Sequence, residues 1–168
     1  MDAAIHLAGR LEPRDAWRAD RCAMARTLDV VRTKSAMLVL REAFYGATRF
    51  DDFVARTEAS EPVVAGRLRE LVAAGLLEHL DYRNPGERTR KGYRLTDKGA
   101  DLFPVLAALM QWGDRWLGDQ SSGVRLEHHG CGESVAVTLR CAAGHGVTSG
   151  EVDLAIDRSS PRSPYAAR

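Results

Sequence analysis

The chain has 168 residues, 45% of them hydrophobic and 28% charged, and its formal net charge is +1. This length accommodates one domain with a small appendage. The nearly neutral balance excludes a globally basic nucleic-acid coat, so any affinity for DNA must come from a local patch.

Residues 1–19 show little periodicity and are predicted to form a loosely ordered arm with at most one helical turn. They lack the basic-then-apolar pattern of a secretory signal. No apolar run in the chain approaches the roughly 20 residues of a membrane helix. The three cysteines are widely spaced and do not suggest a secreted disulfide framework. We therefore expect a cytoplasmic protein without membrane contact.

A domain is predicted over residues 20–118, and it begins with two helices. Residues 20–32 carry an apolar stripe of Cys22, Ala25, Leu28 and Val31. Residues 33–45 form the next helix, which Gly46 ends. Its side chains predicted to be buried are Met37, Leu38, Leu40 and Phe44.

A helix-turn-helix is predicted next, with Phe50 and Phe53 anchoring its first helix. Ser60 is the expected N-cap of the second helix, Pro62 lies in its first turn, and Gly75 ends it. Its apolar stripe is Val64, Leu68 and Leu71, at helical spacing. This arrangement presents a second helix to a DNA major groove.

The opposite face and N-terminal end of this helix are the predicted DNA-reading surface: Ser60, Glu61, Pro62, Val63, Gly66, Arg67 and Arg69. The N-terminal residues should face base edges, because the helix enters the groove by that end. An arginine can bind guanine with two hydrogen bonds. Arg67 lies deeper in the helix, so contact with phosphate or an ion pair with Glu70 or Glu61 is an equal alternative.

Two strands, residues 76–82 and 92–95, flank a Pro-Gly turn and predict a hairpin, or wing. Over residues 80–95 there are five basic side chains against two acidic ones. A basic ribbon beside a helix-turn-helix indicates contact with flanking phosphates or the minor groove. A solvated surface hairpin is the alternative. The predicted contacts are Arg83, Arg88, Arg90 and Lys91.

Thr96 is the expected N-cap of a long helix over residues 97–117, which Pro104 should kink. Its apolar face is wider than one small domain needs, which suggests a subunit interface and a homodimer. Two recognition helices would then meet successive major grooves of a near-palindromic site. The face consists of Leu102, Val105, Leu106, Leu109, Trp112, Trp116 and Leu117.

After a linker at residues 120–123, residues 124–156 are predicted to form a small β-rich appendage. Residues 124–126 and 135–139 alternate like short strands. Four side chains offer ligand chemistry suited to tetrahedral Zn²⁺: His129, Cys131, Cys141 and His145. A metal-free appendage is the alternative. Residues 157–168 are rich in Ser, Pro and Arg and are predicted to be disordered.

An ordered series of short motifs carries a family resemblance. It runs from Cys22 and Asp29 through Arg41-Glu42, Arg49-Phe50 and Arg67-Leu-Arg-Glu-Leu71 to Tyr93-Arg-Leu-Thr96-Asp-Lys-Gly99 and Trp112-Gly113. The series resembles the HxlR-type branch of the MarR-like winged-helix regulators over about residues 20–117. The family usually has Gly-Gly-Lys-Trp where this chain has Arg32-Thr-Lys34-Ser35.

The resemblance implies an α+β, mainly α fold, a winged helix-turn-helix with a long C-terminal dimerisation helix. It also implies a dimer built from the N-terminal and C-terminal helices. Some relatives sense oxidants or electrophiles at the position of Cys22, and a thiol at a helix N-terminus beside Arg21 and Arg26 is favoured as thiolate. A buried small hydrophobe in the dimer core is the alternative for Cys22. Some relatives also have a Cys-x-x-Cys-Gly knuckle, whose second Cys is Gly144 here.

These features predict a homodimeric, sequence-specific regulator that binds double-stranded DNA, with a small molecule or oxidant as a candidate effector. A winged-helix module that binds another protein and not DNA is the alternative. An enzyme built on the Cys/His cluster is disfavoured, because no third orienting group accompanies a Cys–His pair.

Overall fold

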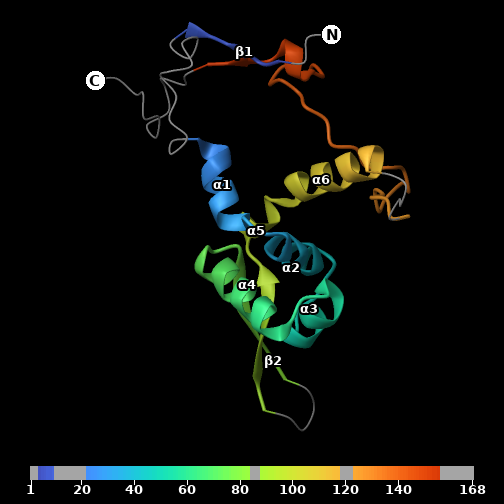
Figure 1. Cartoon of the computed structure of the whole chain (residues 1–168). Helices are drawn as coiled ribbons and strands as arrows, with labels where there is room; N and C mark the ends of the chain where they lie inside the picture. Colours follow the sequence, from blue (N-terminus) through green and yellow to red (C-terminus); the bar gives the residue numbers. More distant parts are fainter. Residues whose placement is uncertain (1–3, 10–21, 84–87, 118–122, 156–168) are drawn as a thin grey trace. The chain divides into compact units, whose positions relative to one another are not determined.

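The computed structural model describes residues 4–9, 22–83, 88–117 and 123–155 (Figure 1). The chain divides into two compact units, one formed by residues 27–137 and the other by residues 1–26 with 138–168. The predicted tail, residues 157–168, lies outside the described residues, as does residue 156.

The helices of the first unit include the predicted helix-turn-helix. In chain order the elements are α1 Ala23–Val31, α2 Lys34–Phe44, α3 Phe50–Thr57, α4 Glu61–Ala73, β2 Leu77–Tyr82, β3 Arg90–Leu95, α5 Asp97–Ala100 and α6 Phe103–Trp116.

Helix α2 begins and ends where local chemistry satisfies its terminal backbone groups. The hydroxyl of Thr33 accepts a hydrogen bond from the Ala36 amide at 3.1 Å. At the other end Gly46 has a φ of +88°, and the Ala47 amide donates to Glu42 O at 2.9 Å. The predicted stop at Gly46 is therefore confirmed.

The buried face of α2 differs in phase from the prediction. Val39 and Leu40 are buried, whereas Met37, Leu38 and Phe44 are only half-buried. The packing on α3 and α4 is centred on Ala36, Val39 and Leu40, so the apolar pattern alone misplaced the inward face.

Helix α4 begins and ends at the predicted residues. Ser60 is its N-cap residue, although its side chain makes no capping hydrogen bond, and Pro62 lies in the first turn. Gly75 has a φ of +70° and donates to Val72 O at 2.9 Å, while the Leu76 amide reaches Leu71 O at 2.9 Å. This pair of bonds is a Schellman motif, which requires a left-handed residue and so favours glycine.

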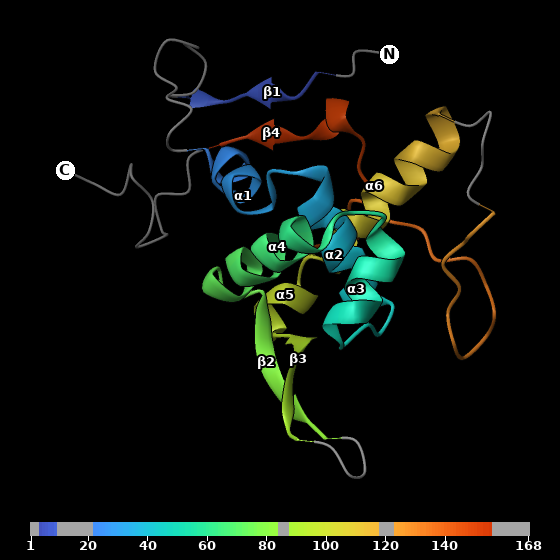
Figure 2. The same ribbon diagram turned by 60° about the horizontal axis from the view of Figure 1, so that its bottom comes forward.

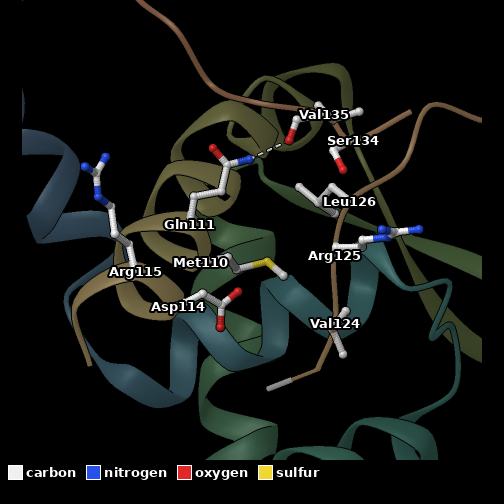
Figure 3. Close-up of a pocket in the computed structure, with 9 residues that line it drawn as sticks. All are labelled: Met110, Gln111, Asp114, Arg115, Val124, Arg125, Leu126, Ser134 and Val135. Carbon is white, nitrogen blue, oxygen red and sulfur yellow. Dashed lines mark hydrogen bonds between the residues drawn. The ribbon is translucent and has the colours of Figure 1, made fainter. Parts of the chain in front are cut away.

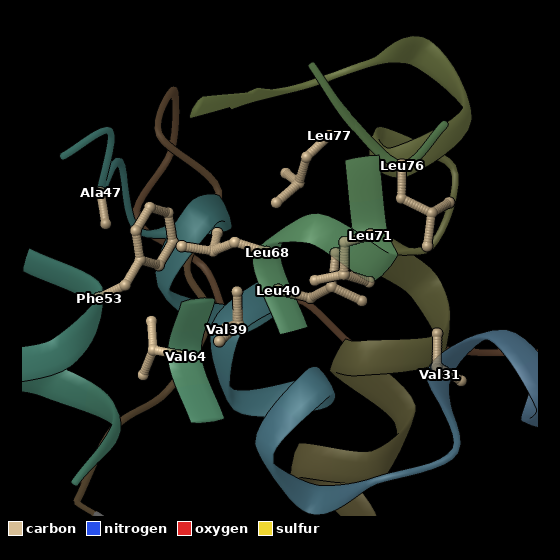
Figure 4. Close-up of a cluster of buried hydrophobic side chains, with 10 residues drawn as sticks. All are labelled: Val31, Val39, Leu40, Ala47, Phe53, Val64, Leu68, Leu71, Leu76 and Leu77. Carbon is tan, nitrogen blue, oxygen red and sulfur yellow. The ribbon is translucent and has the colours of Figure 1, made fainter. Parts of the chain in front are cut away.

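The hydrophobic core lies where α2, α3 and α4 meet the start of β2 (Figure 4). The predicted stripe of α4, namely Val64, Leu68 and Leu71, is buried, and so is Phe53 of α3. Phe53 packs edge-on against Tyr93 of β3, with ring centroids 5.9 Å apart. The core thus fixes α4 and the base of the hairpin relative to each other.

Strands β2 and β3 form an antiparallel hairpin that extends beyond the helices (Figure 2). The register pairs Leu77 with Leu95 at the base and Tyr82 with Arg90 toward the tip. The Tyr93 amide donates to Thr48 O at 2.8 Å, which joins the ribbon to the loop between α2 and α3. A Cβ at Gly92 would lie 2.7 Å from the same oxygen, so this close approach requires glycine.

The predicted long last helix is two helices. Thr96 caps α5 as expected, accepting from the Gly99 amide at 3.0 Å. The chain then leaves the helix after Ala100, and Pro104 lies in the first turn of α6. Proline lacks an amide hydrogen and clashes with the carbonyl four residues earlier, so it begins a new helix here and does not kink a continuous one.

The described terminal segments differ most from expectation. Within the predicted arm, His6–Leu7 form strand β1, which pairs in parallel with β4, Asp153–Leu154. The predicted strands at residues 124–126 and 135–139 are absent, and only two isolated bridges occur there, Glu127 with Ser134 and Arg140 with Gly146. Nearly all side chains of residues 127–146 are exposed, so alternating residues have no face to bury.

A short 3-10 helix, η5 Ser149–Glu151, precedes β4 and has a reciprocal cap. The Glu151 carboxylate accepts from the amide and the hydroxyl of Thr148, both at 2.8 Å. These hydrogen bonds stabilise the ionised carboxylate, and the bond from the backbone amide has the larger effect. Together they hold the pKa of Glu151 below its usual value. None of the helices in the described ranges is long and apolar enough to cross a membrane.

Candidate nucleic-acid interface

The N-terminal end of α4 is exposed to solvent. Ser60, Glu61, Pro62 and Val63 are all solvent-exposed, and Gly66 is half-buried one turn later. Because Val64, Leu68 and Leu71 lock the other face into the core, these outward residues have a fixed orientation. The predicted residues at the N-terminal end of α4 are therefore accessible to a ligand.

The two arginines of α4 are already engaged within the protein. Arg67 forms an ion pair with Glu70 at 2.5 Å, the alternative that the sequence left open, and its Nε is enclosed with no hydrogen-bond partner among the described residues. Arg69 donates from Nε to Ala65 O, four residues earlier, at 3.3 Å. Glu70 uses Nη1 of Arg67, so a base contact through both terminal nitrogens of Arg67 would compete with Glu70.

The hairpin presents basic side chains on its outer part. Arg83, Arg88, Arg90 and Lys91 are exposed, and Lys91 lies across the ladder from Asp81. Arg94, nearer the base, is neutralised by a cross-strand ion pair with Glu78 at 2.6 Å. The turn at residues 84–87 lies outside the described residues.

Arg49 is a cation beside the hairpin that the sequence did not predict as a DNA contact. It is the N-cap residue of α3, and its guanidinium carbon lies 5.0 Å from the centre of the Tyr82 ring. This cation–π contact brings a further positive charge between the start of the helix-turn-helix and the ribbon. Its only signal in the sequence was its place before Phe50, because Tyr82 is remote along the chain.

The three cysteines are all free thiols. Cys22 is half-buried immediately before α1, and its carbonyl accepts from the Arg26 amide at 3.1 Å. Cys131 and Cys141 are exposed, and the sulfur of Cys131 lies 3.2 Å from Nδ1 of His128. The structure thus places Cys22 at a helix N-terminus, as predicted.

The four predicted zinc ligands are divided between the two compact units. His129 and Cys131 belong to one compact unit, and Cys141 and His145 to the other. Within the described ranges, no three His, Cys, Asp or Glu side chains come together in a way that could hold a metal ion. A tetrahedral zinc site at these four residues stays a prediction.

A helix-turn-helix followed by a basic two-stranded ribbon defines a winged helix-turn-helix protein. Known proteins agree with this class. The family model for the HxlR-like helix-turn-helix matches residues 30–121. The uncharacterized HTH-type transcriptional regulator Rv3095 of Mycobacterium tuberculosis is 37% identical over 131 residues, 77% of this chain and 82% of that protein. The corresponding regulator sll1512 of Synechocystis is 33% identical over 101 residues, 60% and 73% of the two chains.

Solved structures show the same fold. PA1607, a candidate transcription factor, superposes with a TM-score of 0.73 at 34% identity over 82% of this chain and 96% of its own. The redox regulator HypR in its oxidized form gives 0.51 at 26% identity, over 56% and 96% of the two chains. The chain belongs to the HxlR-like helix-turn-helix family, and it is a DNA-binding transcriptional regulator.

Proposed function

We propose that the protein acts as a homodimer in which two copies of α4 and of the β2–β3 hairpin bind a near-palindromic operator. One observation carries the DNA interface: α4 packs its apolar stripe inward and leaves Ser60, Glu61, Pro62 and Val63 exposed, next in the chain to an exposed basic ribbon. Since the partner is DNA, the same proposal places the protein in the cytoplasm.

The two parts of the interface have different proposed roles. The outward residues of α4 read base edges, where the small side chains and Gly66 permit close approach to the groove. Arg83, Arg88, Arg90 and Lys91 bind phosphates, which position the protein without reading sequence. We add Arg49 to the phosphate contacts, because it lies against Tyr82 of the ribbon. Arg67 and Arg69, engaged with Glu70 and Ala65 O, complete the proposed surface from within α4.

The test is a mobility-shift titration against the DNA upstream of the protein's own gene and against an unrelated duplex, each at several salt concentrations. The double variant Arg88→Ala/Arg90→Ala removes two proposed phosphate contacts. We expect weaker binding to both duplexes and a salt dependence with a slope lower by about 2, or about one per lost contact.

The matched control is Arg125→Ala/Arg140→Ala, which also removes two exposed arginines but outside the hairpin. It should bind like the wild type. Equal loss in both double variants would show that general charge, and not the hairpin, binds DNA. Failure of the wild type to bind even the unrelated duplex at low salt would refute the DNA interface.

The dimer is supported by apolar side chains that the single chain leaves exposed. On α6 these are Phe103, Val105, Leu109, Trp112 and Trp116, with Leu117 following, and on α1 they are Met24, Leu28 and Val30. On α6, Val105, Leu109, Trp112 and Trp116 recur at helical spacing and so share one exposed apolar stripe, and a stripe of this kind usually marks a protein–protein contact. We propose that α1 and α6 form the subunit interface.

We further propose that oxidation of Cys22 controls DNA binding. The thiol lies at the N-terminus of α1, a helix assigned here to the interface, and HypR, a protein of the same fold at 26% identity, is a redox regulator. Mild oxidation should lower DNA affinity at least about tenfold, an order-of-magnitude expectation for a coupling between two sites, and reductant should restore it. Cys22→Ser should abolish the response, whereas Cys131→Ser should retain it. A response that persists in Cys22→Ser would assign sensing elsewhere.

A further inference from the structure

A cavity of about 360 Å³ lies between α6 and the segment that follows it (Figure 3). Met110 and Asp114 of α6 form one side, and Val124, Leu126, Ser134 and Val135 form the other. Both sides belong to the compact unit of residues 27–137. The volume falls in the range of small-molecule sites, about 300–1,000 Å³, and apolar walls with few polar groups are typical of them.

The two walls are fastened to each other by the side-chain amide of Gln111. Its Nε2 donates to Val135 O at 2.8 Å, and its Oε1 accepts from the Val137 amide at 2.9 Å. The Val135 amide in turn donates to Leu126 O at 2.8 Å. Both hydrogen-bonding groups of the amide are thus used to hold the facing segment, so the cavity is preformed between α6 and that segment.

Met110 forms the middle of the apolar floor. Figure 3 shows its thioether between α6 and the strand-like segment that carries Val124 and Leu126. The Tyr45 hydroxyl donates to its sulfur at 3.8 Å, which ties the side chain to the end of α2. Thioether sulfur makes favourable contacts with aromatic rings, so this floor suits a flat aromatic group.

Three charged side chains line the cavity, two arginines and Asp114, and they differ in how they face Met110. The guanidinium carbon of Arg115 lies 5.0 Å from the centre of the Trp116 ring, and Arg125 is paired with Glu127 at 2.5 Å. In Figure 3 both guanidinium groups extend away from Met110, whereas the Asp114 carboxylate lies beside it. A carboxylate has about four acceptor positions, so it can accept from a ligand in addition to its protein contacts.

We propose that this cavity binds small aromatic cations, with the ring on Met110 and Leu126 and the positive group hydrogen-bonded to Asp114. A charge-assisted hydrogen bond of this type is stronger than its neutral counterpart and would set the preference. The proposal concerns a site apart from α4 and the hairpin, and it stands or falls independently of DNA binding.

The test uses the full chain labelled with ¹³C on the methionine methyl groups. The four methionines are Met1, Met24, Met37 and Met110, so the spectrum contains one reporter inside the cavity and others outside it. Met110→Leu assigns the reporter. Benzamidine, benzoate and benzyl alcohol serve as probes of similar size that are cationic, anionic and neutral. Each is titrated to its solubility limit.

We expect benzamidine to shift the Met110 methyl resonance saturably while Met24 and Met37 remain in place. Benzoate should bind at least about tenfold more weakly, and Asp114→Asn should reduce benzamidine affinity by about the same factor, in line with loss of one charge-assisted hydrogen bond. Asp101→Asn, which removes an exposed carboxylate outside the cavity, should have no effect. Unshifted Met24 and Met37 signals in Asp114→Asn verify its fold.

Two results would overturn the proposal. One is a Met110 resonance that does not respond to benzamidine at any concentration. The other is a response to benzoate or benzyl alcohol as strong as that to benzamidine, because it would show that Asp114 selects nothing.

Discussion

At the scale of single residues, Glu42 is the most demanding side chain of the core. Only 4% of the residue is exposed, and its Oε1 accepts from Nε and Nη2 of Arg41 at 2.9 and 2.6 Å. A buried carboxylate without a partner is costly, whereas the complete pair contributes little. The motif Arg41-Glu42 therefore has a structural role inside α2, separate from any contact with DNA.

The contrast with a second arginine gives a quantitative prediction. Arg41→Ala leaves the Glu42 carboxylate buried and unpaired, so the free energy of unfolding should fall by about 3 kcal/mol. Arg56→Ala breaks an exposed pair with Asp52 at 3.7 Å and should lower it by less than about 1 kcal/mol. Urea denaturation at one protein concentration measures both. If Arg41→Ala lowers the free energy of unfolding as little as Arg56→Ala does, Glu42 must find another partner or take up a proton in the variant.

At the scale of elements, the end of α4 is fastened to the start of α5. The Thr96 hydroxyl donates to Gly75 O at 2.7 Å, and Lys98 Nζ donates to Ala74 O at 2.6 Å. A Cβ at Gly99 would lie 2.1 Å from Leu76 O, which only glycine avoids. These contacts fix the C-terminal end of α4 where the chain turns toward α6.

Gly99→Ala tests this junction, and Gly66→Ala, elsewhere in α4, is its control. Gly99→Ala forces the backbone of α5 away from Leu76 and should lower the free energy of unfolding by at least about 2 kcal/mol. Gly66→Ala adds a methyl group in open space within α4 and should raise it by about 0.5–1 kcal/mol. Thermal unfolding at fixed concentration distinguishes them. A Gly99→Ala variant as stable as the wild type would show that the junction can open without cost.

Sequence reasoning succeeded where local chemistry determines an element. Glycines with positive φ at positions 46 and 75 ended two helices as predicted, and Thr96 capped α5. The inward stripe of α4 was also correct, because Val64, Leu68 and Leu71 recur at helical spacing. These are short-range effects that need only the chain's own neighbours.

The failures came where tertiary contacts decide. Neighbouring apolar residues in α2 left its phase ambiguous, and packing on α4 selected Val39 over Leu38. Pro104 lies in the first turn of α6, but it was predicted to kink a continuous helix, because the apolar pattern continues on both sides of it. Arg49 was missed as a neighbour of Tyr82 because their contact is long-range, and the strand predictions after residue 123 lacked a partner surface.

At the scale of the whole molecule, α6 carries more apolar surface than one copy of the chain covers. Trp112, Trp116 and Leu117 are 58%, 64% and 70% exposed. Apolar surface of this kind is unfavourable in water. Its burial against a second copy would stabilise a dimer by roughly 25 cal/mol per Å² of apolar area. The dimer proposed above follows from this excess and should be visible in solution.

Sedimentation equilibrium tests the dimer directly. Wild-type protein should have twice the chain mass at micromolar concentration, and Leu109→Glu/Trp112→Glu should shift it to the monomer, because two charges would be buried in the interface. Its thermal midpoint should also lose the wild type's dependence on protein concentration. Leu139→Glu alters an exposed leucine outside α6 and should leave the mass unchanged. A monomeric wild type would contradict the interface.

The one-sided packing of α4 has a consequence for evolution and for engineering. Its core residues, its glycine cap and its junction with α5 all lie on the inner face or at the C-terminal end. Positions 60, 61 and 63 contribute to none of them, so they can change while the fold is retained. A new recognition specificity could therefore be reached by successive single substitutions, each tolerated by the scaffold, and a library randomised at these three positions should consist mostly of folded proteins.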